Sequence, residues 1–197
     1  MDERLQKQLD FALEIDKEKN IFRQTHLSGH GRNENDAEHA WHMAIMTVLL
    51  AEYANEKIDV LKTVMMLLIH DLVEIDAGDT YAYDEEGKKT QREREEKAAK
   101  RIFGLLPEEQ GGKLMALWEE FEAYETPEAN FAHTMDNIQP VMLNDATDGK
   151  AWLEHGVHLS QILGRNKKTA EGSRELWQYA YEKMIAPNAA KGRIIED

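Results

Sequence analysis

Residues 61–74 read LKTVMMLLIHDLVE, an apolar run that ends in a histidine and two acidic residues. The density of leucine, methionine, valine and isoleucine predicts a buried helix. Ionisable groups at the end of a buried helix lose their hydration, and something must compensate for that loss. On a helix of about 3.6 residues per turn, His70, Asp71 and Glu74 lie at roughly 0°, 100° and 40° around the axis, so they project within one arc. A bound metal ion is the simplest compensating group.

The composition restricts the class of protein. A chain of 197 residues is of the right size for one domain with a substantial core. It contains no cysteine, which excludes disulfides, thiolate catalysis and cysteine-ligated metal sites. The first residues, MDER, are charged and lack the apolar segment of a signal peptide, and no apolar run approaches the roughly 20 residues of a membrane span. We therefore expect a cytoplasmic protein without a membrane partner.

The formal net charge is −14, which argues against binding to a nucleic acid polymer. Such binding needs a basic surface that displaces counterions from the phosphate backbone. A small phosphate-bearing substrate would need a local group of cations, or a metal ion, to overcome the overall repulsion.

Helical periodicity dominates the chain, and no stretch shows the alternation typical of a strand. No repeat or linker divides the sequence, so we expect an all-α, single-domain protein over residues 1–197. The expected helices span residues 5–15, 40–51, 59–70, 90–104, 107–124, 127–142, 157–164 and 169–185.

Two polar segments, residues 20–36 and 75–88, are predicted to be loops because they contain glycines and short polar side chains. Either Asn35 or Asp36 is expected to cap the helix that follows the first loop. Pro140 is expected to kink or locally unwind its helix, because proline lacks the backbone N–H. The last ten or so residues are expected to form a loose polar tail.

Further metal ligands are expected from two other helices. His39 lies one turn into the second helix, and Asp136 lies on the face of a later helix that also carries apolar residues. With His70 and Asp71 they would form a mixed nitrogen and oxygen site, suited to Mn, Fe, Co, Ni or Zn, with Mg as a further candidate. A metal ion there would lower the pKa of bound water, and Glu74 could orient or deprotonate that water.

The motifs of the chain resemble those of the HD-domain metal-dependent phosphohydrolases. They are Glu38-His39, His70-Asp71-x-x-Glu74-x-x-x-x-Asp79, Arg32-x-Glu34-x-x-x-x-His39 and Asp136. The extended set is similar to one branch of that superfamily, which contains bacterial 5′-nucleotidases of deoxynucleoside monophosphates and their eukaryotic relatives. The resemblance covers roughly residues 20–145, and it implies an HD-type helical bundle with a metal site among its helices.

The resemblance also implies roles for single residues. A single divalent metal ion would be held by His39, His70, Asp71 and Asp136. Glu74 matches the catalytic acid that serves the attacking water, and Asp79 matches a carboxylate that acts in catalysis and holds the sugar. Arg23 matches an arginine that binds the substrate phosphate. The chain has Gln24 where the deoxy-selective bacterial enzymes have a tryptophan, which leaves ribose and deoxyribose both open.

The expected function is therefore a metal-dependent 5′-nucleotidase acting on (deoxy)nucleoside monophosphates, and the resemblance suggests a homodimer. Two alternatives within the superfamily are hydrolysis of nucleoside triphosphates and hydrolysis of cyclic nucleotides. From a different class, a metal-stabilised nucleotide-sensing protein would bind the same ligands without turnover.

Overall fold

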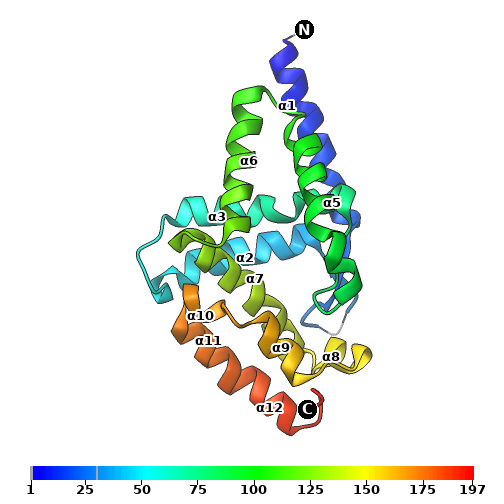
Figure 1. Cartoon of the computed structure of the whole chain (residues 1–197), viewed down its shortest axis with the longest axis vertical. Coiled ribbons are helices and arrows are strands. Elements are labelled where there is room, and N and C mark those ends of the chain that lie inside the picture. The colour runs from blue at the N-terminus through cyan, green and yellow to red at the C-terminus, as the bar shows by residue number, and fades with distance from the viewer. Residues whose placement is uncertain (1, 30) are drawn as a thin grey trace.

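The computed structural model describes residues 2–29 and 31–197, except for the side chain of residue 85. It confirms the all-α class (Figure 1). The N-terminal and central helices are α1 (Glu3–Glu14), α2 (Asp36–Leu50), α3 (Val60–Ile69), α4 (Glu74–Ala77), α5 (Glu85–Phe103), α6 (Glu108–Ala123) and α7 (Pro127–Ala146). The C-terminal helices are α8 (Lys150–His155), α9 (Leu159–Arg165), α10 (Thr169–Gly172), α11 (Arg174–Ala180) and α12 (Ala186–Ala190). Four other short helical segments lie between them. Three are the 3-10 helices η1 (Ile15–Asn20), η2 (Ala51–Tyr53) and η3 (His70–Val73), and the fourth is the π-helical η4 (Tyr181–Ile185).

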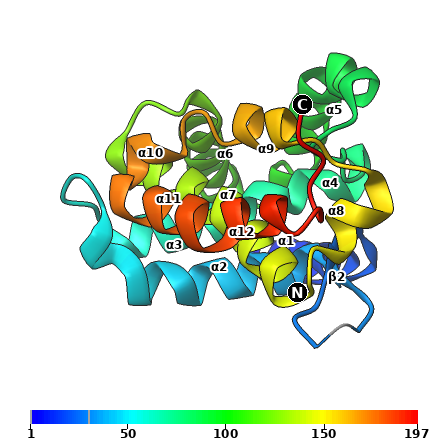
Figure 2. The same cartoon turned by 90° about the horizontal axis from the view of Figure 1, so that it is seen from below.

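Helix α7 occupies the centre of the molecule. It packs against α2, α3, α6, α10 and α11, so helices that precede it and helices that follow it in the chain surround it. Phe131, Met135 and Ile138 are buried on α7 and belong to the larger of two apolar clusters. Figure 2 shows the C-terminal helices crossing over α7, with α2 and α3 along one edge. A single side chain on α7 can therefore meet residues from several distant segments.

Local capping signals placed several helix starts correctly. Asn35 caps α2 through a capping box, in which its side chain accepts from Glu38 N–H and Glu38 accepts from Asn35 N–H. Asp59 caps α3, and Thr126 caps α7 with Pro127 in the first turn. Helix α5 starts earlier than expected, because Asp84 accepts from two backbone N–H groups and acts as its cap.

Residues 20–36 were expected to be a loop, but part of this segment forms a small antiparallel hairpin. Strand β1 (Phe22–His26) pairs with β2 (Asn33–Asn35), with an irregularity in the register between the two ends. The strands are short and largely polar, so backbone pairing stabilises them rather than an alternating apolar face. Asn33 adds a side-chain hydrogen bond to the carbonyl oxygen of Arg23.

The backbone differs from two further expectations. Helix α7 continues through Pro140 to Ala146, so it does not unwind there, and the kink stays a prediction. The final residues are not loose, because Ile194 is only 1% exposed and Ile195 pairs with His158 in a β-bridge. Among the described helices, none combines the length and apolarity needed to cross a membrane.

Candidate metal centre

The helix that carries the apolar run ends before the ionisable residues. His70 starts the 3-10 turn η3, so the expected α-helical arc does not form. Because a 3-10 helix has about three residues per turn, residues i and i+3 lie one above the other. Asp71 and Glu74 therefore share a face, while His70 projects in another direction. This turn separates the site into two groups of side chains.

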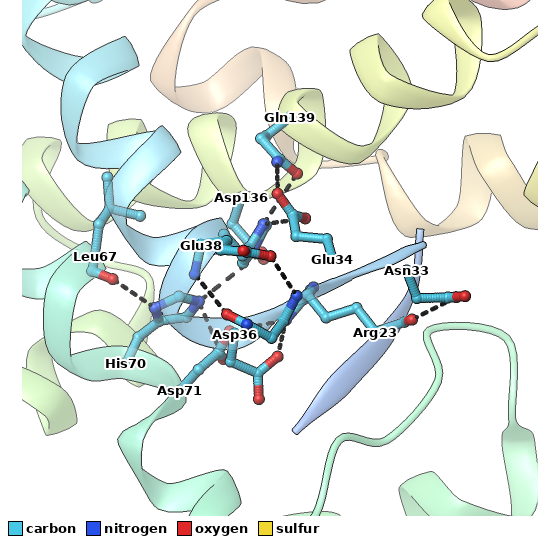
Figure 3. A network of polar contacts seen from close by, with 12 residues as sticks. Arg23, Asn33, Glu34, Asp36, Glu38, Leu67, His70, Asp71, Asp136 and Gln139 are labelled. Carbon is cyan, nitrogen blue, oxygen red and sulfur yellow. Dashed lines mark hydrogen bonds and ion pairs between the residues drawn. The ribbon is translucent and has the colours of Figure 1, made fainter. Parts of the chain in front are cut away.

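The first group consists of His39 from α2, His70 from η3 and Asp136 from α7, and we call it the histidine cluster. All three residues are buried, and each offers a ligand atom within 4.8 Å of the others. The Oδ1 atom of Asp136 lies 3.2 Å from His39 Nε2 and 4.0 Å from His70 Nε2 (Figure 3). The structure thus brings together residues that lie far apart in the sequence, as the metal-site prediction required.

The tautomers of both histidines suit a metal ion. His39 Nδ1 donates to Gln139 Oε1 at 2.9 Å, and His70 Nδ1 donates to the carbonyl oxygen of Leu67 at 3.0 Å. A neutral imidazole has one proton, so Nε2 of each ring carries a lone pair. The buried Nε2 of His70 makes no hydrogen bond of acceptable geometry within the described residues. Two nitrogen lone pairs beside a carboxylate are a donor set that a divalent cation satisfies.

A polar network behind His39 fixes its orientation. Gln139 is fully buried, and its Nε2 donates to Glu34 Oε1 at 2.7 Å and to His42 Nδ1 at 3.1 Å. These two bonds determine that the amide oxygen of Gln139 faces His39. A hydrogen-bond acceptor behind a ligating histidine holds the ring in one tautomer and raises its basicity. Gln139 was not predicted as a site residue, although its position three residues after Asp136 places it on the same helical face.

Without a metal ion the histidine cluster attracts protons. Burial opposes protonation of His70, but the carboxylates of Asp71 and Asp136 outweigh it and raise the pKa of His70 to about 9. The pKa of His39 is also raised, because the Asp136 and Glu34 carboxylates outweigh burial and the repulsion from Arg23. A metal ion must therefore displace protons from this cluster.

The second group consists of Asp36 from α2, Asp71 from η3 and Glu74 from α4, and we call it the carboxylate cluster. Each residue offers an oxygen within 4.8 Å of the others. Asp71 connects the two clusters, because its Oδ1 lies 3.1 Å from His70 Nε2. Its Oδ2 accepts a hydrogen bond of 2.8 Å from Arg23. Asp71 is thus beside the histidine cluster, and its assignment as a fourth ligand stays a prediction.

Crowding of acidic groups raises several pKa values in this region. Burial and the Asp71 charge raise the pKa of Asp36 to about 6, although Arg23 opposes the shift. Burial and the same charge raise the pKa of Glu74 well above its usual range. Glu18, at the back of the cluster, is raised to about 8 by burial and by Asp71. This region therefore holds protons near neutral pH.

Asp36 and Glu18 were not predicted as part of the site. Asp36 was considered only as a helix cap, yet it is fully buried and lies three residues before His39 on the first turn of α2. That spacing places both side chains on one face, and it could have signalled the role. Glu18 lies in a charged 3-10 turn, and nothing in its local sequence distinguishes it from solvated neighbours.

Asp79 reaches the site through a sharp change of chain direction after α4. Gly78 has φ of 75°, a conformation that residues with a Cβ rarely adopt. Asp79 is half-buried, and burial raises its pKa although Arg23 opposes the shift. Asp79 also lines a cavity beside Glu74, and its roles in catalysis and in holding the sugar stay predictions.

A cavity of about 270 Å³ opens onto both clusters. Its wall includes Arg23, Glu74, Asp79, Tyr83, Asp136 and Arg165. Arg165, the last residue of α9, donates to Asp136 Oδ2 at 2.8 Å. It was not predicted, because it lies beyond the part of the chain in which motifs were identified. The cavity thus combines a cation site, buried carboxyl groups and two arginines.

These features match a known family, and the chain belongs to it: the sequence model of the HD domain matches residues 15–177. The helical bundle and the histidine cluster among its helices are in keeping with this assignment.

Individual relatives were found by sequence and by structure. The crystal structure of a predicted metal-dependent phosphohydrolase from Magnetospirillum magnetotacticum MS-1 superimposes with a TM-score of 0.91 at 46% identity, over 97% of this chain and 95% of that one. The 5′-deoxynucleotidase HDDC2 of Homo sapiens is 32% identical over 111 residues, 56% of this chain and 53% of that protein. The Mus musculus protein of the same name is 30% identical over 109 residues, 55% of this chain and 53% of that protein. The chain therefore matches about half the length of these 5′-deoxynucleotidases.

Proposed function

We propose that this protein is a metal-dependent phosphohydrolase that releases phosphate from nucleoside 5′-monophosphates. The observation that carries the proposal is the convergence of two lone-pair nitrogens and a carboxylate beside a cavity that also contains protonatable acids. The names of the relatives support the same chemistry, one being described as a metal-dependent phosphohydrolase and others as 5′-deoxynucleotidases.

His39, His70 and Asp136 would hold one divalent ion, with Asp71 as the fourth ligand. Such an ion activates water and polarises a phosphoryl oxygen. Gln139 keeps His39 in the tautomer that ligation requires, since its amide oxygen accepts the Nδ1 proton. The protein thus supplies the ligands and the network that orients them.

Glu74 would manage the proton of the attacking water. Burial and the Asp71 charge raise the pKa of Glu74 well above its usual range, so this carboxyl holds a proton more readily than an ordinary glutamate, as a general acid must. Asp79 would contact the sugar or give a proton to the leaving oxygen, because it lies in the cavity wall and has a raised pKa. Arg23, also in the wall, would contribute positive charge toward the phosphate.

The test is a phosphate-release assay with purified protein across mono-, di-, tri- and cyclic nucleotides, each with Co, Mn, Mg or Zn. We expect release from nucleoside monophosphates, deoxy or ribo, in a metal-dependent manner. Release mainly from triphosphates or cyclic nucleotides would replace this substrate class with the corresponding alternative. Tight nucleotide binding by the metal-loaded protein without any phosphate release would support a nucleotide sensor.

We also propose that the chain forms a single domain and acts as a cytoplasmic homodimer. The dimer is supported by large exposed apolar side chains on α2 and α3, where Trp41 is 63%, Leu49 is 66% and Leu61 is 72% exposed. Exposed apolar side chains that gather into a patch are typical of interaction sites. Light scattering of the purified protein is expected to give twice the chain mass, and a Trp41→Lys variant is expected to shift it toward the monomer.

A further inference from the structure

Arg165 occupies an unusual position among the charged residues of the cavity. Its Nη2 donates to Oδ2 of Asp136, while Oδ1 of the same carboxylate faces His39. The side chain of Arg165 is 41% exposed, whereas that of Asp136 is 8% exposed. One guanidinium therefore reaches from the open part of the cavity to a residue of the histidine cluster.

Buried hydrogen bonds hold the end of α9 in place against α7. Asn166 directly follows Arg165 and is 3% exposed. Its Oδ1 accepts from Thr169 Oγ1, and Thr169 Oγ1 accepts from Asn137 Nδ2, both at 3.0 Å. Because Asn137 directly follows Asp136, this chain of bonds fixes the backbone of Arg165 beside that residue. The position of the arginine is thus built into the fold.

Arg23, the other arginine in the cavity wall, has a different environment. Its side chain is only 15% exposed, and it donates to Asp71 Oδ2 and Asp36 Oδ1. Two carboxylates therefore already balance its charge. Arg165 has Asp136 as its one hydrogen-bond partner within the described residues. Most of its five N–H donors therefore have no acceptor among those residues.

The cavity needs such a cation if it is to bind a phosphate dianion. Its wall carries several acidic side chains, among them Asp71, Glu74 and Asp79, and the whole chain has a net charge of −14. Like charges at this distance disfavour a second anion unless local cations offset them. An arginine fork can donate two parallel hydrogen bonds to phosphate oxygens, which adds geometric fit to the charge.

We propose that Arg165 binds the phosphate group of the substrate while it remains paired with Asp136. The proposal rests on the proposed function for the identity of the substrate, but phosphate binding can be measured without turnover. It assigns to α9 a direct role in recognition. The competing explanation is a purely structural ion pair, in which Arg165 serves only to orient Asp136 for the metal ion.

The two explanations differ in what an Arg165→Gln substitution changes. If Arg165 binds phosphate, the metal-loaded variant binds orthophosphate at least about 10-fold more weakly in calorimetry, and KM for the nucleotide rises by a similar factor. Its affinity for Mn or Co alone then changes less than about 3-fold. If the pair is structural, metal affinity falls at least as much as phosphate affinity, and that result would overturn the proposal.

Two further variants complete the test. Arg165→Lys keeps the charge but loses the fork, so we expect it to restore part of the phosphate affinity. Lys167→Gln removes an exposed positive charge two residues away and is expected to leave phosphate binding unchanged. Equal weakening by Lys167→Gln would show a general charge effect and would contradict a specific contact. If the wild-type protein hydrolyses no nucleotide, the proposed function fails, while the orthophosphate comparison still decides the role of Arg165.

Discussion

The histidine cluster and the carboxylate cluster are adjacent and equally buried, but their chemistry differs. In the first, both Nδ1 atoms donate to neighbouring oxygens, and the Nε2 atoms of His39 and His70 face Asp136, where each can bind a proton or a metal ion. In the second, Asp36, Asp71 and Glu74 have oxygen atoms only, and Arg23 is the neighbouring cation.

The comparison shows how two clusters of side chains with similar burial can differ in what they bind, a metal ion in one case and protons in the other. Two imidazole nitrogens held beside a carboxylate favour a metal ion, which must first displace the protons that this cluster binds. Crowded carboxyl groups favour protons that exchange, because their mutual repulsion raises their pKa values. Asp71 touches both groups, so the two functions lie within a few ångströms of each other.

The largest effect is expected from Glu74→Gln, which removes a proton-transfer group from the carboxylate cluster. We expect kcat to fall by about 10²–10⁴-fold, the usual contribution of general acid–base catalysis. Metal affinity measured by calorimetry should change only a few-fold, since the amide is of the same size. The exposed Glu119→Gln on α6 is the control. A loss of metal binding equal to the loss of turnover would instead make Glu74 a ligand.

A His70→Ala substitution tests the other cluster. If four ligands share a binding free energy of roughly 10–16 kcal/mol, the loss of one weakens metal binding by about 100-fold or more. Titration with Co or Mn, followed by calorimetry, measures this directly. His155→Ala, at an exposed position on α8, should bind metal like the wild type. Unchanged affinity in His70→Ala would exclude the histidine cluster as the metal site.

A smaller effect on the histidine cluster is expected from Gln139→Leu. The substitution removes the oxygen that accepts the His39 Nδ1 proton and leaves Glu34 without its amide partner. Loss of a residue that hydrogen-bonds to a ligating side chain usually lowers metal affinity by about 10–100-fold. Gln178→Leu, on the exposed face of α11, provides the matched control. A wild-type affinity in Gln139→Leu would show that His39 does not depend on this network.

The smallest effect concerns pH and the metal-free protein. Glu18, with a pKa of about 8, and Asp36, with a pKa of about 6, both bind protons more tightly when folded than when unfolded, as His70 does at about 9. Each group therefore stabilises the folded protein fully at pH values below the pKa that it has in the unfolded chain. This contribution is lost as the pH rises through the pKa that the group has in the folded protein. We expect Tm to fall between about pH 5 and 9, by roughly 2–4 °C for each kcal/mol lost.

Two samples check the origin of this pH dependence by thermal unfolding. Glu18→Gln removes one raised group, so its Tm should vary less with pH than that of the wild type. Saturating Mn should also reduce the variation, since an ion that binds only the folded state stabilises it and displaces protons. A metal-free Tm that rises steadily from pH 6 to 9 would contradict the assignment.

The sequence predicted those features that depend on neighbouring residues. The caps Asn35 and Asp59 are local hydrogen-bonding signals, and both start the expected helices. The hairpin and the six-residue α8 were missed, because their short segments are stabilised mainly by contacts with distant parts of the chain. Local patterns alone do not contain that information.

For the candidate site, the sequence likewise predicted some residues and not their full arrangement. His39, His70 and Asp136 were identified as ligands from their order and spacing, and the structure places their ligand atoms together. The division into two clusters could not be predicted, because it depends on the change from α-helix to 3-10 helix at His70. Arg165 was missed because its hydrogen bond to Asp136 forms only once the fold brings the end of α9 beside that residue.

Pro140 has a consequence for how the site adapts to different ions. In an α-helix the carbonyl oxygen of Asp136 would accept a hydrogen bond from the amide four residues later, but proline has no N–H to donate. The backbone turn that carries Asp136, the predicted ligand, therefore lacks one helical hydrogen bond. We expect the carboxylate to shift by a few tenths of an ångström at little cost, enough to accommodate the difference in radius between Zn and Mn. The continuous helix α7 would thus contain a more deformable turn at the residue that is predicted to bind the metal ion.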